Sequence, residues 1–260
     1  VTLTYAELNA QQITYKPPLN VFGSPHANLL FRVADGISTS GNATLSINVN
    51  AVNDAPTTSN TSFTLAEDAT FTFSSTSFPF ADVESSLIHS VRIVTVPAVG
   101  LLQNLAGNVS AGALITSTSL SQLLYVPPAN ATGSPISSFT FRVSDGALES
   151  ELATATLIVS PVNDSPSGAN FTRTIFEDTV HTFSLADFAF TDISDSPMNS
   201  LASVEIMSIP PAAVGRLTLS NVDLATVPTR RILKADLESG NLKFTPAQNF
   251  NGTGVIALTF

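Results

Sequence analysis

The stretch Phe31-Arg-Val-Ala-Asp-Gly36 returns as Phe141-Arg-Val-Ser-Asp-Gly146, at an offset of 110. Val52-Asn-Asp-Ala-Pro56 returns at the same offset as Val162-Asn-Asp-Ser-Pro166. Further pairs in this register are Tyr15-Lys-Pro-Pro18 with Tyr125-Val-Pro-Pro128, and Gly23-Ser-Pro25 with Gly133-Ser-Pro135. Because several matches share one offset, the sequence contains an internal repeat of about 110 residues.

A third copy of the repeat follows with small insertions. Glu67-Asp68 matches Glu177-Asp178 at offset 110, whereas Tyr125 matches Phe244 at offset 119. We predict that residues 1–56 are the C-terminal half of one repeat, 57–166 a complete repeat, and 167–260 a third repeat truncated before its last strands. Both ends fall inside a pattern, so we expect a slice of a longer chain.

The hydrophobic period inside a repeat is two, which indicates β-strands. Phe139, Phe141 and Val143 alternate with polar residues, and apolar residues at every second position from Ala153 to Val159 do the same. The pattern indicates no sustained helix, although residues 233–239 fit one short helical turn.

The predicted fold class is all-β, with tandem antiparallel seven-stranded β-sandwiches. Short strands separated by Pro, Gly, Asn and Asp, at about 100 residues per unit, are typical of this architecture. We expect the 17 Phe residues, in a chain without Trp, to supply most of the core. Burying one Phe contributes roughly 1.5–3 kcal/mol, so disulfides are not needed.

Composition excludes several classes of function. The formal net charge of −10 disfavours nucleic acids and anionic membrane surfaces as partners. The absence of cysteine excludes disulfides, zinc–thiolate sites and cysteine nucleophiles. No apolar run reaches the roughly 18 residues of a membrane span, so we expect no direct membrane insertion.

The motif Leu242-Lys-Phe-Thr-Pro-Ala-Gln-Asn-Phe-Asn-Gly252, the Phe-Arg-Val-x-Asp-Gly strands and the Val-Asn-Asp-x-Pro linkers resemble the cadherin-like (Ig-like) tandem repeats of very large bacterial and protist surface proteins. The resemblance covers essentially the whole chain. It implies sandwiches strung end to end on a cell surface or in an extracellular filament. It also implies calcium at the repeat junctions.

The calcium motifs of cadherins are matched only in part. Their Asp-x-Asn-Asp-Asn-Ala-Pro linker keeps its Asn-Asp core and proline here, but Ala51 and Pro161 replace the leading Asp. Their Asp-x-Asp motif resembles residues 82–84 and, imperfectly, 192–195, and the glutamate near the domain start resembles Glu67 and Glu177. The Leu-Asp-Arg-Glu motif has no counterpart. The resemblance therefore favours one Ca²⁺ per junction, or none, over three.

Calcium needs six to eight oxygen ligands, which carboxylates and amide carbonyls from several loops can supply. The predicted ligands of a first junction are Asn53, Asp54, Asp82, Glu84 and Asp145. Those of a second junction are Glu67, Asp68, Asn163, Asp164, Asp192 and Asp195. The alternative is ordinary turn chemistry, because Asp-Gly pairs such as Asp145-Gly146 form hairpin turns and Asn-Asp before Pro forms turns.

No enzymatic constellation is present, so we predict a non-enzyme. The three His residues are scattered, without a metal-binding HExxH pair, and neither a nucleophile elbow nor a phosphate-binding loop motif occurs. His181 takes the repeat position of Phe71, which favours an aromatic packing role.

Glycosylation sequons define a further set of candidate sites. They are Asn42, Asn60, Asn108, Asn130, Asn170 and Asn251. A seventh, at Asn163, is weakened by Pro166 and overlaps the predicted calcium site.

The sequence therefore predicts an extracellular stalk or filament shaft, with neighbouring repeats of the same chain as its main partners and Ca²⁺ stiffening the junctions. Other copies of the chain, surface proteins and glycans are the further partners. The alternatives are a carbohydrate-binding module, although the chain lacks Trp and has three Tyr, and a laterally self-assembling filament subunit without calcium.

Overall fold

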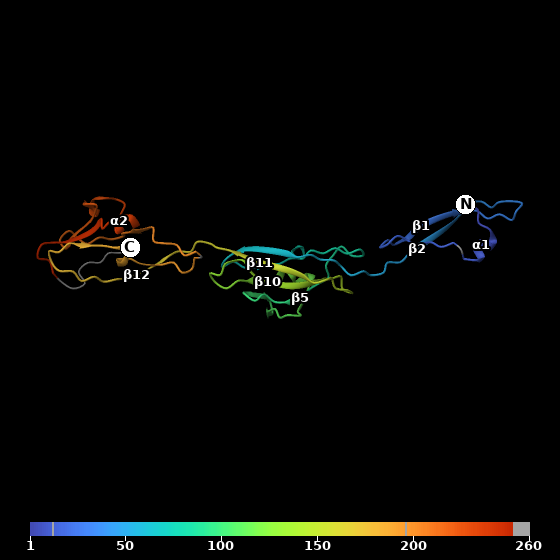
Figure 1. The fold of residues 1–260 in the computed structure, drawn as a ribbon, viewed down its shortest axis with the longest axis horizontal. Coiled ribbons are helices and arrows are strands. Elements are labelled where there is room, and N and C mark those ends of the chain that lie inside the picture. The colour runs from blue at the N-terminus through green and yellow to red at the C-terminus, as the bar shows by residue number, and fades with distance from the viewer. Residues whose placement is uncertain (12, 196, 252–260) are drawn as a thin grey trace. The chain divides into compact units, whose positions relative to one another are not determined.

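The computed structural model describes residues 1–11, 13–195 and 197–251 (Figure 1). By its internal contacts the chain divides into two units, Val1–Ser160 and Pro161–Phe260. The described residues are almost entirely strands and loops. Two five-residue α-helices occur in them, α1 (Tyr5–Asn9) and α2 (Lys234–Glu238). The short helix expected at 233–239 is therefore confirmed. No helix in the described ranges is long and apolar enough to cross a membrane.

Residues 1–56 contain one antiparallel hairpin, made of β1 (Gly23–Phe31) and β2 (Ala43–Val49). Phe31 lies opposite Ala43, and the register shifts between Gly23 and Ala27. A hairpin of the same register recurs at offset 110 in β10 (Gly133–Ser144) and β11 (Ala153–Ser160). The internal repeat seen in the sequence is thus present in the strand pairing.

The segment that follows forms two sheets. The five-stranded sheet has the order β3-β11-β10-β5-β8, and the four-stranded sheet has the order β4-β9-β6-β7. Only the β3–β11 pair in these sheets is parallel. The bounds are β3 (Thr61–Ala66), β4 (Phe71–Thr72), η1 (Ser75–Ser77), β5 (Ser90–Thr95), β6 (Leu101–Asn104), β7 (Gly107–Asn108), β8 (Leu114–Thr116), η2 (Ser117–Gln122) and β9 (Leu124–Val126). The all-β class is confirmed, whereas the count of seven strands is not, because these sheets contain nine strand segments.

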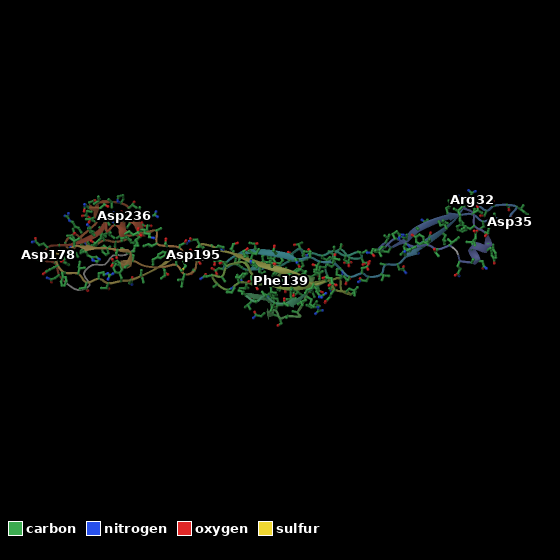
Figure 2. All side chains as sticks on the ribbon, in the orientation of Figure 1. Arg32, Asp35, Phe139, Asp178, Asp195 and Asp236 are labelled. Atoms are coloured by element: carbon green, nitrogen blue, oxygen red, sulfur yellow. The ribbon has the colours of Figure 1, made fainter. Side chains whose placement is uncertain are left out.

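Aromatic residues from both sheets fill the core of this segment. Phe139 and Phe141 of β10 are at most 1% exposed, as the alternation predicts, and Figure 2 shows Phe139 within this part of the chain. Phe73 lies 5.8 Å from Phe139, and Phe78 lies 5.0 Å from Phe141, both edge to face. Such aromatic pairs stabilise the core beyond simple burial.

The second unit has a smaller version of this arrangement. Its described strands pair as β13-β19-β16-β17, β15-β18 and β12-β14. The bounds are β12 (Ser167–Ala169), β13 (His181–Thr182), η3 (Leu185–Asp187), β14 (Ala189–Thr191), β15 (Ser203–Glu205), β16 (Gly215–Leu219), β17 (Val222–Asp223), η4 (Leu224–Thr226), β18 (Arg231–Leu233) and β19 (Leu242–Pro246). His181 pairs with Phe244 and packs edge to face on Phe183 at 4.7 Å, so its expected aromatic role is confirmed.

The first residue of the second and third predicted repeats pairs through its backbone with an equivalent residue of a later loop or strand. Thr57 and Ala81 exchange two backbone hydrogen bonds of 2.7 and 3.0 Å. The equivalent residues Ser167 and Thr191 face each other in β12 and β14. The repeat boundaries 1–56, 57–166 and 167–260 stay predictions.

Candidate functional site

The linker before residue 57 is held by two polar contacts to loops that are distant in sequence. The Asn53 side-chain amide donates to Asp145 Oδ2 at 2.8 Å. The Asp54 backbone N–H donates to Glu84 Oε2 at 3.1 Å. Four of the five ligands predicted for the first junction therefore meet at this linker.

Asp82, the fifth predicted ligand, organises the loop that carries Glu84. Its Oδ1 accepts hydrogen bonds from the backbone N–H groups of Glu84 at 3.0 Å and Ser85 at 2.5 Å. Its Oδ2 is buried and has no hydrogen-bond partner among the described residues. One oxygen thus shapes the loop, and the other remains available for a ligand.

Asp145 combines a turn role with the linker contact. Its Oδ1 accepts from the backbone N–H groups of Ala147 at 2.7 Å and Leu148 at 2.8 Å. The pKa of Asp145 lies below its ordinary 3.8, chiefly because the carboxylate accepts a hydrogen bond from the Leu148 N–H. The Ala147 N–H and the Asn53 side-chain amide lower the pKa further, and desolvation offsets part of the effect. Asp35 forms the same turn with Ile37 and Ser38, so the hairpin-turn interpretation of both Asp-Gly pairs is correct.

The linker of the second unit repeats the backbone contact. Asp164 N–H donates to Asp195 Oδ1 at 2.7 Å, as Asp54 N–H does to Glu84. The Asn199 side-chain amide donates to Asn163 Oδ1 at 2.8 Å and also to Asp195 Oδ2. Repeat alignment could not find Asn199, because it lies where insertions break the constant offset.

Two carboxylates of this unit, Asp192 and Asp195, are buried. Asp192 is 6% exposed and Asp195 7% exposed. Asp192 Oδ1 has no hydrogen-bond partner among the described residues.

Glu67 and Asp68, predicted for the second junction, belong to the first unit. Glu67 is 4% exposed, and its backbone N–H donates to Ser160 O at 2.9 Å. Asp68 has a left-handed backbone with φ of 58°, and its Oδ1 accepts from Asn130 N–H at 3.0 Å. Asp178 and Asn249 repeat this contact at 2.9 Å. The contact gives Asp68 a structural role within its own unit.

The donor set fits calcium only with help from amide and carbonyl oxygens. Among the described residues, no group of three or more His, Cys, Asp or Glu side chains is close enough to hold a metal ion. The buried oxygens Asp82 Oδ2 and Asp192 Oδ1 are nevertheless what a hard cation would satisfy. Each loop can thus offer one unsatisfied carboxylate oxygen.

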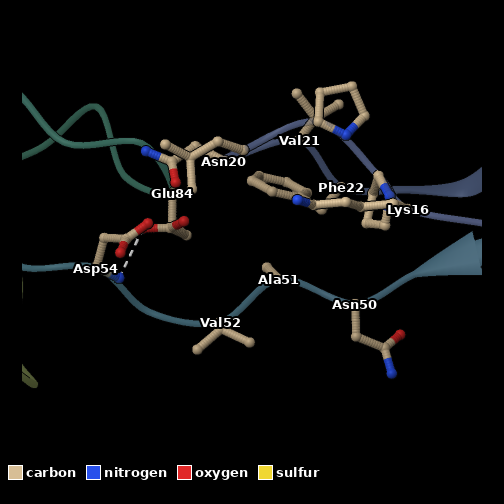
Figure 3. Close-up of a pocket in the computed structure, with 12 residues that line it drawn as sticks. Lys16, Asn20, Val21, Phe22, Asn50, Ala51, Val52, Asp54 and Glu84 are labelled. Atoms are coloured by element: carbon tan, nitrogen blue, oxygen red, sulfur yellow. Dashed lines mark hydrogen bonds between the residues drawn. The ribbon is translucent and has the colours of Figure 1, made fainter.

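An open hollow of about 840 Å³ lies beside the first linker (Figure 3). One wall is the loop from Lys16 to Phe22, and the other is the chain from Asn50 to Val52 with Asp54 and Glu84. Figure 3 shows the Asp54–Glu84 hydrogen bond at one end of the hollow. Its lining mixes apolar rings and methyl groups with a few polar groups, as small-molecule sites do.

All six glycosylation candidates, Asn42, Asn60, Asn108, Asn130, Asn170 and Asn251, are exposed. Asn60 also has a structural contact, because its Oδ1 accepts from Thr154 N–H at 2.8 Å. The sequon residues after Asn251 lie outside the described residues.

Comparisons with known proteins agree with the sequence motifs. Residues 53–160 match a family model described as bacterial Ig domain. Two solved structures, protocadherin gamma B2 extracellular cadherin domains 3–6 and the protocadherin gamma B4 extracellular domain, are similar at 12% identity and a TM-score of 0.38. The similarity covers 83% of this chain and 48% of the first structure, and 85% and 34% for the second, so this chain spans less than half of either. No curated protein matches the sequence. The segment from residue 53 to residue 160 is thus similar to bacterial Ig domains, in agreement with the Ig-like repeat that its motifs predict.

Proposed function

We propose that this chain is a non-enzymatic, structural or adhesive stalk segment of an extracellular surface protein or filament, in which each repeat contacts mainly its neighbours. The carrying observation is the recurrent linker contact, Asp54 N–H to Glu84 and Asp164 N–H to Asp195. A linker fixed to the following loop in the same way in two repeats supports a defined connection rather than a flexible one.

Calcium is the proposed cofactor of these linkers. Asn53, Asp54, Asp82, Glu84 and Asp145 would hold it in the first unit. Asn163, Asp164, Asp192 and Asp195 would hold it in the second, where we add Asn199, while Glu67 and Asp68 remain predicted ligands. When bound, the ion supplies positive charge that offsets clustered carboxylates in a chain of net charge −10. The protein's own contribution is to fix these loops before the ion arrives.

Thermal unfolding in millimolar calcium and in chelator tests this role. We expect calcium to raise the melting temperature, because a ligand that binds only the folded state stabilises it. The Asp82→Asn/Asp192→Asn variant removes the two unsatisfied oxygens and should abolish the rise. Glu151→Gln/Glu205→Gln removes the same charge elsewhere and should keep it. A folded wild-type chain with no shift at any calcium concentration would refute the ion role.

X-ray scattering in solution tests the stalk separately. A defined connection predicts a maximum dimension that changes little between samples and a narrow distance distribution. A broad distribution typical of freely jointed units would contradict the stalk, whether or not calcium binds.

The hollow at the first linker favours one second candidate, a carbohydrate-binding role. Phe22 offers an aromatic ring, and Lys16 and Asn50 offer polar groups. Chemical-shift changes confined to these residues on adding oligosaccharides would support it. A spectrum that does not change with any oligosaccharide in a panel would reject the carbohydrate-binding role and leave the stalk as the proposed function.

A further inference from the structure

The middle repeat, predicted at residues 57–166, contains two Arg residues, no Lys and eight Asp or Glu residues. Its two Arg residues, Arg92 of β5 and Arg142 of β10, are direct partners in the antiparallel pairing of these strands, which Figure 1 labels. Like charges directly opposite each other on neighbouring strands destabilise a sheet. The stability of the fold therefore does not explain this arginine pair.

The repeat pairs only one of these two charges with a carboxylate. Arg92 Nε donates to Glu149 Oε1 at 2.5 Å, and Arg92 Nη1 donates to the Gly112 carbonyl at 3.3 Å. Arg142 Nη1 donates to the backbone carbonyl of Ser150 at 2.5 Å. No ion pair between described residues includes Arg142. Since a guanidinium has five N–H donors, Arg142 keeps donors and a positive charge for a ligand.

Both guanidinium groups lie on the outer face of the five-stranded sheet. Ile93 and Phe141, their neighbours in the chain, are 0% exposed, so the alternation along each strand directs residues 92 and 142 away from the core. The Arg92 side chain is 40% exposed, and Arg142 is partly exposed. A ligand in solution can therefore reach the pair.

The second unit has the opposite charge at the position of Arg92. The stretch Ser90-Val-Arg-Ile93 aligns with Ser203-Val-Glu-Ile206, so Glu205 stands where the middle repeat has Arg92. Glu205 lies opposite Arg231 of β18, which is an attractive pairing. The strand accepts a glutamate at this position, so its packing does not require an arginine.

A row of threonine hydroxyls runs beside the arginine pair on the same face. Thr140 lies two residues before Arg142 on β10, which is roughly 7 Å along the strand. Thr140 lies opposite Thr95 of β5 and Thr154 of β11. The hydroxyls of Thr95 and Thr140 are hydrogen-bonded at 2.8 Å, so both lie on one face. This face therefore combines two cationic donors with hydroxyls that can donate and accept hydrogen bonds.

We propose that this face binds an acidic oligosaccharide, whose carboxylate lies between Arg92 and Arg142 and whose neighbouring hydroxyls contact the threonine row. A planar carboxylate matches the fork of a guanidinium and accepts short, charge-assisted hydrogen bonds from it. The bound carboxylate also offsets the repulsion between the two cations. The site goes beyond the structural role of the stalk, and it needs neither calcium nor the hollow at the first linker.

Other anionic partners fit this face less well. An extended peptide adds to a sheet at its edge through backbone hydrogen bonds, whereas β5 and β10 are interior strands of this sheet. A nucleic acid carries a phosphate at every nucleotide, and the net charge of −10 repels such a polyanion. A sugar chain with isolated carboxylates offers one charge to the arginine pair and hydroxyls to the threonines.

Titration of the full chain with acidic oligosaccharides in chelator tests the site. The probes are short oligosaccharides that contain uronic acids or sialic acid, together with their methyl esters, which lack the charge. We expect the acids to bind, with an affinity that falls as salt is added, and the esters to bind at least about tenfold more weakly. Chemical-shift changes should centre on residues 92 and 142. Because the chelator removes calcium, the result is independent of the linker proposal.

Substitutions separate this site from general charge effects. Arg142→Gln should weaken binding at least about tenfold, because it removes the guanidinium that has no carboxylate partner. Arg142→Lys keeps the charge but loses the fork, so it should recover only part of the affinity. Glu149→Gln removes the carboxylate that competes for Arg92 and should strengthen binding about threefold. Arg231→Gln removes the same charge from the second unit and should leave the affinity unchanged.

Circular dichroism shows whether each variant is folded. Equal affinities of the wild type and a folded Arg142→Gln variant would overturn the proposal, as would the absence of binding by every acid in the panel. Methyl esters that bind as tightly as the acids would refute the role of the carboxylate. A sulfated oligosaccharide or a short oligoglutamate that binds equally well would show that the face takes any anion, which contradicts the assignment to an acidic sugar.

Discussion

The Tyr125 hydroxyl donates a hydrogen bond to the backbone carbonyl of Val99 at 3.0 Å, and the Tyr125 ring covers the next residue, Gly100. A Cβ at residue 100 would lie 2.6 Å from Cε2 of the ring, and its φ of +76° is left-handed. Phe244 covers Gly215 in the same way in the second unit. The position needs glycine for both space and backbone conformation.

Two substitutions separate the hydrogen bond from the close approach. Tyr125→Phe removes only the hydroxyl and should lower the free energy of unfolding by about 0.5–1.5 kcal/mol. Gly100→Ala should lower it by about 2–4 kcal/mol, because it adds left-handed strain and a clash with the ring. Urea unfolding followed by circular dichroism measures both. Equal losses would show that the ring can move away from residue 100.

Tyr125 should also make the stability of the fold decrease at alkaline pH. Burial raises the pKa of its phenol above the ordinary 10.0. The unfolded chain therefore releases this proton at lower pH than the folded chain, so the stabilisation is complete below pH 10 and is lost as pH rises toward the folded value. Ultraviolet titration of phenolate should show a late component that Tyr125→Phe lacks. Identical titration curves per remaining tyrosine would contradict the prediction.

A pair of compensating residues distinguishes the two compact units. Arg173 forms an ion pair with Asp187, and Asp187 is 2% exposed. At the equivalent positions the middle repeat, which is the one predicted at residues 57–166, has Phe63 and Ser77. Asp187 Oδ2 accepts from Ser184 N–H at 2.8 Å, just as Ser77 Oγ accepts from Ser74 N–H at 3.0 Å. Both repeats therefore keep the hydrogen bond from the serine N–H in this turn. The buried charge of Asp187 additionally requires a cation, which Arg173 supplies.

Exchanging this pair should reveal the coupling. Arg173→Phe alone leaves Asp187 buried without its cation and should cost about 1–3 kcal/mol, less than for a fully buried pair because Arg173 is half exposed. Arg173→Phe/Asp187→Ser restores the residues of the middle repeat and should recover most of the loss. A double-mutant cycle measures the coupling. If the losses in the free energy of unfolding were additive, the two residues would not be energetically coupled.

The same carboxylate should contribute stability at neutral pH that is lost in acid. Burial alone would raise the pKa of Asp187, but the Ser184 N–H and the Arg173 guanidinium outweigh it and hold the pKa below 3.8. The stabilisation is therefore fully present above pH 3.8 and is lost as pH falls through the lower folded value. Unfolding from pH 6 to pH 2 should show a shallower pH dependence for Asp187→Asn than for the wild type. Parallel curves would exclude a contribution from Asp187.

Much of the middle repeat follows from sequence because its signals are local or repeated. Alternation alone predicts that Phe139, Phe141 and Val143 are buried, and each is at most 1% exposed. The linker residues Asn53 and Asp145 lie 92 positions apart, and the resemblance to cadherin calcium motifs implies that both belong to one junction, where their side chains are hydrogen-bonded.

Contacts without a repeated counterpart could not be predicted. Asn199 lies among insertions, so no offset marks it as a partner of Asn163 and Asp195. The Arg173–Asp187 pair replaces an apolar residue and a small polar one, and its two members lie 14 residues apart without a helical spacing. The number of strands could not be predicted from the hydrophobic pattern either, because segments as short as β4 and β7, with two residues each, are too short to show a period.

Asp68 offers a test that separates turn structure from metal binding. Its left-handed backbone and its hydrogen bond from Asn130 N–H suit asparagine as well as aspartate. Asp68→Asn should therefore change the free energy of unfolding in chelator by less than about 0.5 kcal/mol, whereas Asp68→Ala should cost about 1–3 kcal/mol. Asp178→Asn and Asp178→Ala repeat the comparison in the second unit, where Asn249 N–H is the donor. If Asp68 is also a calcium ligand, Asp68→Asn should keep its stability in chelator but lose part of the calcium-induced rise in melting temperature. An unchanged rise would leave Asp68 with the turn alone, because asparagine preserves the hydrogen bond while removing the negative charge that a cation needs.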